Sequence, residues 1–291
     1  MQDFNGKIAV VTGGAGGIGK SLVRELLNAG ATVVVADVEQ GALDSAVEEL
    51  SALGSVSGRI VDVSSQESVH ALAAHVYNTF GACHLLFNNA GVAAPSANVW
   101  DTTANDWTWV FGVNVMGVMH GIQSFVPRMI EGGEEGYIIN TSSGDGGVSP
   151  LPYQSVYASS KAAVSCLTEC LSAQLEGEGT KLGASIFYPS GGMLKTGIWN
   201  PDRNRPEQLT REKPGIPAPK IEDFAKVFEK HGMKMEFQDL DELARYCLDG
   251  IRDQRFVIMI GLENSEATLL DRAQRIGRTE RPIDFEPIPS F

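Results

Sequence analysis

The sequence is poor in positive charge and in long apolar runs. It has 23 Lys and Arg residues against 36 Asp and Glu, which gives a formal net charge of −13. A nucleic-acid surface needs clustered cations to displace counterions, so this balance argues against nucleic acid as a partner. No run reaches the roughly 18 uninterrupted apolar residues of a membrane span, and the start of the chain lacks the basic-then-apolar layout of a secretory signal. We therefore expect a cytoplasmic protein without a membrane partner.

Cysteine and histidine are also scarce. The four cysteines form no CxxC pair, and the five histidines lack the mutual spacing of metal ligands. The sequence therefore predicts no metal site. We expect Cys83, Cys166, Cys170 and Cys247 to be reduced thiols, with Cys166 and Cys170 on a buried helix face.

Short apolar runs alternate with longer segments of helical period along the chain. Runs that are apolar on both faces are typical of buried parallel strands, and the helical segments between them are typical of crossover connections. The sequence therefore predicts an α/β fold, a Rossmann-like doubly wound parallel sheet of about seven strands with helices on both faces. We expect a single domain over residues 1–291. The expected strands are Ile8–Val11, Val33–Ala36, Ile60–Val63, Leu85–Asn88, Tyr137–Asn140, Ala184–Tyr188 and Phe256–Ile260.

The longest expected helix, Val156–Leu175, is followed later in the chain by a long irregular stretch. From about residue 190 to 235 the pattern breaks at five prolines. Such a stretch inside a compact domain is usually a functional lid or a disordered insertion, and we favour a substrate lid. Residues 263–291 are expected to form a C-terminal helix, Glu266–Ile276, and a tail. The apolar residues that could line the lid are Met193, Leu194, Ile198 and Trp199.

A glycine-rich turn, Thr12-Gly13-Gly14-Ala15-Gly16-Gly17-Ile18-Gly19, joins the first strand to the apolar helix Ser21–Leu27. Without side chains, the turn can tighten and let backbone N–H groups approach a pyrophosphate, whose charge the helix dipole favours. The strand–turn–helix context therefore predicts a dinucleotide site. Its candidate residues are Thr12, Gly13, Gly17, Ile18 and Gly19.

The second expected strand is followed by Asp37, 18 residues after Gly19. A carboxylate here accepts hydrogen bonds from the adenosine ribose hydroxyls and repels a ribose 2′-phosphate. Neither the glycine turn nor Val38 supplies a compensating cation, so NAD is expected rather than NADP. The ends of the third and fourth strands add residues that could bind the adenine and ribose of the cofactor. The same residue types are also common in turns at strand ends, so turn formation alone would explain them. These candidates are Asp62, Val63, Asn89, Ala90 and Gly91.

Tyr157 and Lys161 are one helical turn apart and follow the serine pair Ser142 and Ser143. A phenol becomes a useful base only when its anion is stabilised, and a cation on the same helix face can do this. For Tyr157 to act as a base near neutral pH, its pKa must fall by roughly three units from the usual value of about 10. This shift corresponds to about 4 kcal/mol. A cation at about 4 Å in an effective dielectric of about 20 supplies that much before desolvation is subtracted.

With Asn114, these ordered motifs resemble the short-chain dehydrogenase/reductase family over about residues 6–262. The resemblance implies that Tyr157 is the catalytic acid/base and that Lys161 lowers its pKa and binds the nicotinamide ribose. It also implies that Ser143 orients the substrate oxygen and that Asn114 holds a water in a proton relay.

Two spacings differ from the family pattern. The interval from Ser143 to Tyr157 is one residue longer than usual, through residues 144–147, so Ser142 is an alternative to Ser143. After the sixth strand, the segment from Pro189 to Thr196 is two residues longer than in the family pattern. The resemblance still implies that Pro189 and Thr196 contact the cofactor.

The family resemblance and Asp37 together imply an NAD-dependent oxidoreductase that interconverts a secondary alcohol and its ketone. The apolar segment from Met193 to Trp199 suggests a lipophilic substrate, and steroid alcohols and aromatic, benzylic alcohols are the candidates. The resemblance also implies a homodimer or homotetramer. Two alternatives are a non-catalytic NAD-binding sensor or scaffold and an NADPH-dependent oxoacyl-carrier-protein reductase. Asp37 and the long lid argue against the latter.

Overall fold

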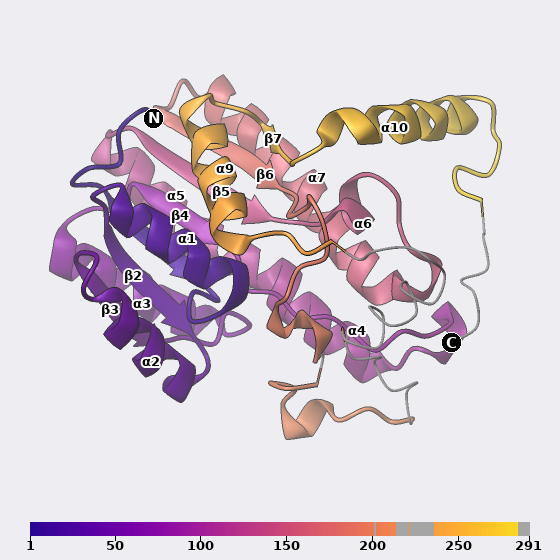
Figure 1. Cartoon of the computed structure of the whole chain (residues 1–291), viewed down its shortest axis with the longest axis horizontal. Coiled ribbons are helices and arrows are strands. Elements are labelled where there is room, and N and C mark those ends of the chain that lie inside the picture. The colour runs from indigo at the N-terminus through magenta and orange to yellow at the C-terminus, as the bar shows by residue number, and fades with distance from the viewer. Residues whose placement is uncertain (201, 214–220, 222–235, 285–291) are drawn as a thin grey trace.

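A seven-stranded parallel sheet forms the centre of the molecule (Figure 1). The computed structural model describes residues 1–200, 202–213, 221 and 236–284. The strand order is β3-β2-β1-β4-β5-β6-β7, so the expected doubly wound, Rossmann-like topology is confirmed. The strands are β1 (Ile8–Thr12), β2 (Thr32–Asp37), β3 (Val56–Ile60), β4 (Leu85–Asn88), β5 (Gly136–Thr141), β6 (Leu182–Phe187) and β7 (Val257–Ile258).

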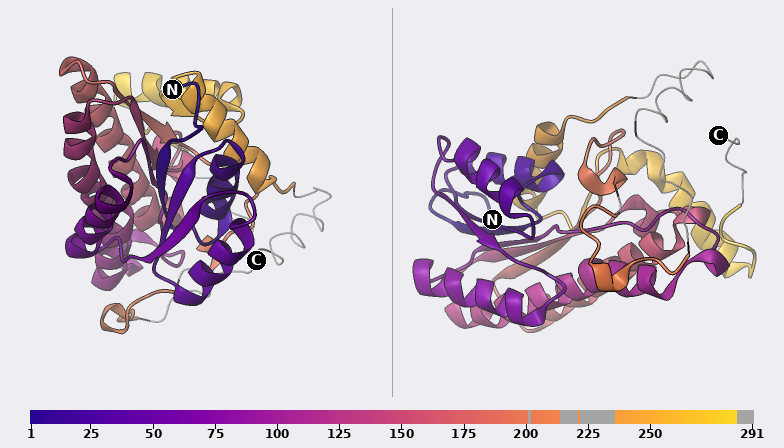
Figure 2. Two further views of the ribbon diagram at one scale, coloured as in Figure 1. Left: turned by 90° about the vertical axis from the view of Figure 1, so that its left-hand side faces the viewer. Right: turned by 90° about the horizontal axis from the view of Figure 1, so that it is seen from below.

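Helices cover both faces of this sheet (Figure 2). In β2, Val33 and Val35 belong to one apolar core, and Val34 and Ala36 belong to the other. Strands buried on both sides need apolar residues at every position, which explains the continuous runs in the sequence. The first core is covered by α1 (Gly17–Asn28), α2 (Gln40–Leu50) and α9 (Leu240–Arg252), and the second by α3 (Gln66–Phe80), α5 (Gly117–Gly132) and α7 (Ser155–Gly177).

The remaining elements surround the carboxyl edge of the sheet or lie near the end of the chain. They are η1 (Val99–Asp101), α4 (Ala104–Phe111), the π-helical η2 (Gly112–Met116), α6 (Gly144–Gly147), η3 (Pro152–Gln154), η4 (Gly197–Trp199), η5 (Glu207–Leu209) and α10 (Leu262–Gly277). The helix α10 stands apart from the rest of the molecule in Figure 1 and contains no buried residue.

The position expected for the third strand is wrong. The sequence favoured Ile60–Val63, but β3 is Val56–Ile60 and pairs with β2 on one side only. An edge strand is partly open to solvent, and here Ser57, Gly58 and Arg59 interrupt the apolar pattern. The apolar residues Val61 and Val63 are buried against the helices of the second core instead.

The expected burial of Cys166 and Cys170 is also wrong, because both are exposed. The helix α7 buries a face that includes Val164 and Leu171, and the two cysteines lie on the opposite face. Cys83 and Cys247 are buried. Burial raises the pKa of the Cys83 thiol to about 12.

The expected lid is only partly described. Residues 190–200 and 202–213 contain two short 3₁₀ turns, and residues 201, 214–220 and 222–235 lie outside the described part of the chain. Of the expected lining residues, Leu194 packs against the core beneath α1 and α9. The last residues of the expected tail, 285–291, are also outside the described part.

One described helical stretch, Ala104–Gly132, is long and apolar enough to cross a membrane by length and composition alone. It comprises α4, η2 and α5, and 56% of its most apolar window is buried inside the fold. The core helix of a compact domain has the same composition, so we interpret this stretch as part of the core.

Candidate functional site

The candidate site lies where the strand order reverses, between β1 and β4. The chain passes outward from β1 to β2 and β3, and then returns to β4 on the other side of β1. Parallel sheets bind ligands outside the carboxyl ends of their strands at such a switch point. The glycine turn, the segment after β4 and the serine pair after β5 all follow strands at this edge.

The glycine turn has no room for side chains at two positions. A Cβ atom at Gly13 would lie 2.8 Å from the Cα of Ala90, and one at Gly19 would lie 2.1 Å from the carbonyl oxygen of Gly13. Gly17 begins α1 with a positive φ, and neither a capping side chain nor an acidic residue occupies the first turn. Uncapped N–H groups at a helix N-terminus favour a phosphate. The turn therefore fits a dinucleotide pyrophosphate.

Asp37 lies at the end of β2 beside this turn. Its carboxylate accepts hydrogen bonds from the backbone N–H of Ala15 at 3.0 Å and of Glu39 at 3.1 Å. These two bonds fix the side chain next to the glycine turn while leaving it partly exposed. Within the described chain no cation forms an ion pair with it, so its negative charge can face a ribose.

Thr12 and Asn89 join the ends of β1 and β4. The Thr12 hydroxyl donates to the carbonyl of Phe87 at 3.2 Å and accepts from the N–H groups of Asn89 at 2.9 Å and Ala90 at 3.1 Å. The Asn89 amide donates to the carbonyl of Thr12 at 3.0 Å. This network fixes the shape of the expected cofactor floor, including the segment that leads to Gly91.

Asp62 and Val63 follow β3 and have structural contacts of their own. The Asp62 carboxylate accepts from the Ser64 N–H at 2.9 Å and from the Ser64 hydroxyl at 2.7 Å, as in a tight turn. Val63 is buried, and its carbonyl lies 2.9 Å from Nδ1 of His120. Local turn chemistry is therefore sufficient to explain Asp62.

Tyr157 lies in the first turn of α7, beside the hydroxyl of Ser143. The Ser143 side chain acts on the Tyr157 hydroxyl in the direction that lowers its pKa. Ser142 instead points into the core, where its hydroxyl donates to the Lys161 carbonyl at 2.7 Å and lies 2.9 Å from the Ser165 hydroxyl. Of the two serines, Ser143 is therefore the one placed to share an oxygen ligand with Tyr157.

Lys161 is buried one turn after Tyr157. Its ammonium group donates to the carbonyl of Thr141 at 2.9 Å. Burial lowers the pKa of Lys161 to about 8, and burial raises the pKa of Tyr157 to about 12 despite the opposing effect of Ser143. Burial therefore dominates the pKa of Tyr157, and the lowering of that pKa by Lys161 stays a prediction.

Asn114 lies in the π-helical segment between α4 and α5. Its amide oxygen accepts from the Val92 N–H at 2.9 Å, and its amide nitrogen donates to the Val92 carbonyl and to the Ser160 hydroxyl, both at 2.9 Å. Both amide hydrogens are thus used in joining the segment after β4 to α7. A π-helix is rare and often marks a functional site. The side chain therefore has a structural role in addition to the expected relay role.

The segment after β6 crosses this edge of the sheet, and we call residues 196–200 and 202–213 the strap. A Cβ atom at Gly17 would lie 3.2 Å from Cγ2 of Thr196, so the strap begins against the glycine turn. Farther along it, Arg203 and Asn204 contact Glu39 at 2.8 and 2.9 Å. Pro189 lies two residues after β6, before the strap.

The far part of the strap is held by a buried ion cluster. The Asp106 carboxylate is completely buried and lies 2.6 Å from Arg205 and 3.1 Å from Arg211. The guanidinium of Arg205 also lies 4.5 Å from the ring centre of Trp109. Sequence reasoning missed this cluster, although Thr103 and Asp106 have the spacing of a capping box, which the structure contains.

Asp145 is a second residue that the sequence did not single out. It lies in α6, inside the longer interval between Ser143 and Tyr157, and its backbone N–H donates to the Ser143 hydroxyl at 3.3 Å. Burial raises the pKa of its carboxyl to about 6, and its charge raises the pKa of Tyr157. The unusual spacing between Ser143 and Tyr157 was the feature of the sequence that could have pointed to Asp145.

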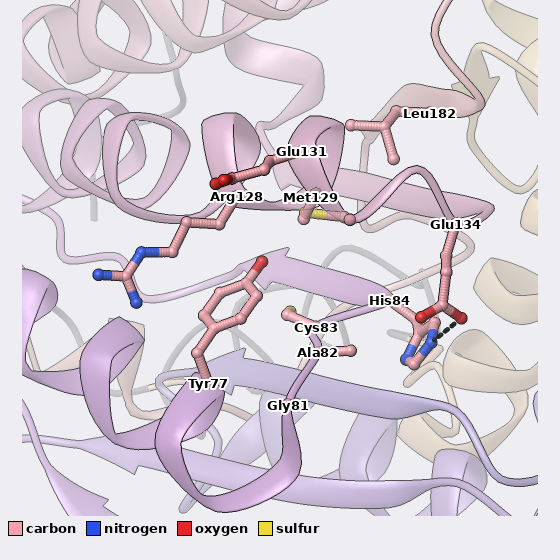
Figure 3. Close-up of a pocket in the computed structure, with 11 residues that line it drawn as sticks. Tyr77, Gly81, Ala82, Cys83, His84, Arg128, Met129, Glu131, Glu134 and Leu182 are labelled. Carbon is pink, nitrogen blue, oxygen red and sulfur yellow. Dashed lines mark hydrogen bonds and ion pairs between the residues drawn. The ribbon is translucent and has the colours of Figure 1, made fainter.

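A cavity of about 460 Å³ lies elsewhere, among residues that precede β4, β5 and β6 (Figure 3). Nε2 of His84 lies 3.0 Å from Glu134, and Nδ1 of the same ring accepts from the Ile8 N–H at 3.0 Å. Both histidine nitrogens are thus engaged in joining strand ends. This cavity is at the amino edge of the sheet, opposite Tyr157, and is not part of the candidate site.

Comparisons with known proteins agree with this arrangement. The short chain dehydrogenase family matches residues 7–206. The C alpha-dehydrogenase of Sphingobium sp. is 31% identical over 288 residues, covering 99% of this chain and 90% of its own. The fluoren-9-ol dehydrogenase of Terrabacter sp. is 34% identical over 62% of this chain and 55% of its own. A short chain dehydrogenase/reductase from Burkholderia phymatum, solved in complex with NAD, is 37% identical with a TM-score of 0.88 and covers 99% of this chain and 100% of its own. The protein is therefore an oxidoreductase that belongs to the short-chain dehydrogenase/reductase family.

Proposed function

We propose that the protein is an NAD-dependent oxidoreductase that interconverts a secondary alcohol and its ketone. The observation that carries this proposal is the neighbouring pair of Tyr157 and Ser143, with buried Lys161 one helical turn away. This pair lies at the sheet edge that also carries the glycine turn. Two hydroxyl groups that face the same space can hold one substrate oxygen and exchange a proton with it.

In the oxidation, Tyr157 takes the proton of the substrate hydroxyl while Ser143 hydrogen-bonds the same oxygen. NAD, when bound, would accept the hydride at nicotinamide C4, and its positive ring would favour the ionised tyrosine. The carbinol carbon thereby becomes a carbonyl, and reduction reverses both transfers. Lys161 uses one of its three N–H groups on Thr141, which leaves the others for the nicotinamide ribose.

The preference for NAD rests on Asp37. A ribose 2′-phosphate at this position would meet a carboxylate that two backbone N–H groups fix beside the glycine turn. Arg203 reaches the same region of the chain but is paired with Glu39. The Burkholderia relative bound to NAD supports the same choice.

An aromatic or otherwise lipophilic substrate is supported by the apolar cluster next to Tyr157. Ala94, Trp109, Val110 and Val156 form this cluster, and Leu209 of the strap packs against it. This cluster is buried beside the start of α7, and an apolar neighbourhood of this kind favours an apolar ring near the reacting carbon. Fluoren-9-ol, which the Terrabacter relative is named for, is a secondary benzylic alcohol. We further propose a homodimer or homotetramer, as is common in the family.

The test is oxidation of fluoren-9-ol with NAD by the wild-type protein and by Tyr157→Phe. Loss of the phenol hydroxyl should lower kcat by about 10²- to 10⁴-fold, because proton transfer to a positioned base contributes that much. The dissociation constant for NADH should stay within about twofold. Undiminished turnover by Tyr157→Phe would overturn the mechanism, and turnover with NADP but not NAD would overturn the choice of coenzyme.

A further inference from the structure

Ser160 is a buried serine in the second turn of α7, just before Lys161. Its hydroxyl donates to the carbonyl of Tyr157 at 2.7 Å and accepts from the amide nitrogen of Asn114 at 2.9 Å. Ser160 and Asn114 are both 0% exposed. A hydroxyl has one proton, and here the Tyr157 carbonyl takes it. The serine can therefore only accept from Asn114, which determines the end of the amide that faces α7.

Asn114 carries this contact across to the segment after β4. Its amide group forms two hydrogen bonds, both 2.9 Å long, with the backbone N–H and the carbonyl of Val92. Val92 directly follows Gly91, which is exposed and belongs to the expected cofactor floor. A Cβ atom at Gly91 would lie 3.5 Å from the amide oxygen of Asn114 and 3.3 Å from the nitrogen of Lys161. The hydroxyl of Ser160 thus joins the first two turns of α7 to this floor.

The separation between these two parts of the site matters for hydride transfer. Tyr157 and Ser143 would hold the substrate oxygen, whereas the floor at Gly91, next to Lys161, would lie under the nicotinamide ribose. Transfer needs the reacting atoms about 3–3.5 Å apart, and a displacement of about 1 Å can cost 10²-fold in rate. A buried and satisfied hydrogen-bond network is rigid, because a buried polar group that loses its partner is costly.

Building on the proposed function, we propose that Ser160 is a positioning residue that sets the separation between the bound alcohol and the coenzyme. Because Ser160 has no exposed surface, it acts through Asn114 and not by touching a reactant. Loss of its hydroxyl frees one side of the Asn114 amide and lets the segment at Gly91 shift relative to α7. Both reactants still bind, but they reach the reactive geometry less often, so the loss falls on kcat.

Thr168, about two turns farther along α7, provides a matched control. Its hydroxyl donates to the carbonyl of Val164 at 2.7 Å and accepts from the amide nitrogen of Asn140 at 2.9 Å, and it is also 0% exposed. These bonds match those of Ser160 in kind and in length. Asn140, however, continues to the side chain of Asn88 inside the sheet and not to the cofactor floor. Thr168→Val therefore removes an equivalent buried hydroxyl away from the proposed site.

The experiment measures oxidation of fluoren-9-ol with NAD by the wild type, Ser160→Ala and Thr168→Val. Ser160→Ala should lower kcat by about 10-fold or more, while KM for the alcohol and the dissociation constant for NADH stay within about twofold. Thr168→Val should keep kcat within about twofold, although both variants should unfold at a lower urea concentration than the wild type. Adding Ser160→Ala to Asn114→Ala should lower kcat no further, because Ser160 acts through Asn114.

Two results would overturn the proposal: equal kcat values for Ser160→Ala and Thr168→Val, or losses of kcat that multiply when Ser160→Ala is added to Asn114→Ala. Hydrogen–deuterium exchange gives a test without turnover. The backbone N–H of Val92 should exchange faster in Ser160→Ala than in the wild type, and at the wild-type rate in Thr168→Val. If the wild type oxidises no alcohol, the proposed function fails, and an unchanged exchange rate at Val92 would separately refute the role of Ser160.

Discussion

The nitrogen of Lys161 lies 5.7 Å from the centre of the Tyr157 ring. A cation at this distance is within the range of a favourable contact with an aromatic ring. The bond to the Thr141 carbonyl holds the ammonium at the end of β5, where a Cβ atom at Gly91 would lie 3.3 Å from it. Lys161 is thus placed to orient groups that bind beside Gly91 as well as to affect the phenol.

The serine pair gives a first prediction. Ser143→Ala should lower kcat by about 10²-fold or more, because it removes the hydroxyl beside Tyr157 that would hold the substrate oxygen. Ser142→Ala removes a buried hydroxyl bonded to Lys161 and Ser165, so it should chiefly lower the free energy of unfolding, by about 1–2 kcal/mol. Steady-state kinetics measure the first effect and urea unfolding measures the second. A large loss of kcat in Ser142→Ala with little change in Ser143→Ala would contradict the geometry.

A second prediction concerns stability and pH. The pKa of Asp145 is about 6 in the folded protein, above its ordinary value of 3.8, so the folded state binds the proton more tightly. The carboxylate therefore destabilises the fold above about pH 6, and this effect disappears as the pH falls toward 4. Asp145→Asn should raise the free energy of unfolding at pH 7 by about 1–2 kcal/mol after allowance for partial exposure.

Urea unfolding of the wild type and Asp145→Asn at pH 7 and pH 4 measures this difference. The two proteins should differ at pH 7 and converge at pH 4. A variant that is less stable than the wild type at both values would show that the carboxylate supports the fold.

The ion cluster of the strap gives a third prediction. Asp106→Asn leaves Arg205 and Arg211 without their buried counter-charge, and breaking such a cluster should cost about 3–5 kcal/mol. Asp202→Asn removes an exposed partner of the same Arg205 and should cost less than about 1 kcal/mol. Denaturant unfolding measures the free energy of unfolding of both variants. Equal losses of stability in Asp106→Asn and Asp202→Asn would mean that the burial of Asp106 does not strengthen its ion pairs.

Coenzyme choice gives a fourth prediction. Asp37→Ser should raise the ratio of kcat/KM for NADP to that for NAD by about 10-fold or more, because it removes the charge that opposes a 2′-phosphate. Asp62→Asn is the matched control, since the Asp62 carboxylate bonds Ser64 within its own turn and the substitution should leave the ratio unchanged. If Asp62→Asn changed the ratio and Asp37→Ser did not, Asp62 and not Asp37 would be the residue that selects the coenzyme.

The strand order, the glycine turn and the neighbourhood of Tyr157 and Ser143 could be predicted because each depends on local pattern and on order along the chain. The edge strand β3 could not, because only Val56 and Ile60 of its five residues are large and apolar. The pairing of Asp106 with Arg205 could not be predicted either, since it joins residues about a hundred positions apart. The rise in the pKa of Tyr157 on burial could not be predicted either, because desolvation depends on packing that the sequence does not reveal.

Two attachments in the middle of the strap, at Arg203 and at Arg205, differ in their exposure to solvent. Near α4 the strap is tied by a carboxylate with no exposure to water, and near α2 by Arg203 and Glu39, whose side chains are 48% and 32% exposed. Solvent weakens the second attachment far more than the first, so thermal opening should start beside the adenosine end and hinge on Asp106. We therefore expect the contact of Arg203 with Glu39 to break while the contact of Arg205 with Asp106 is still intact.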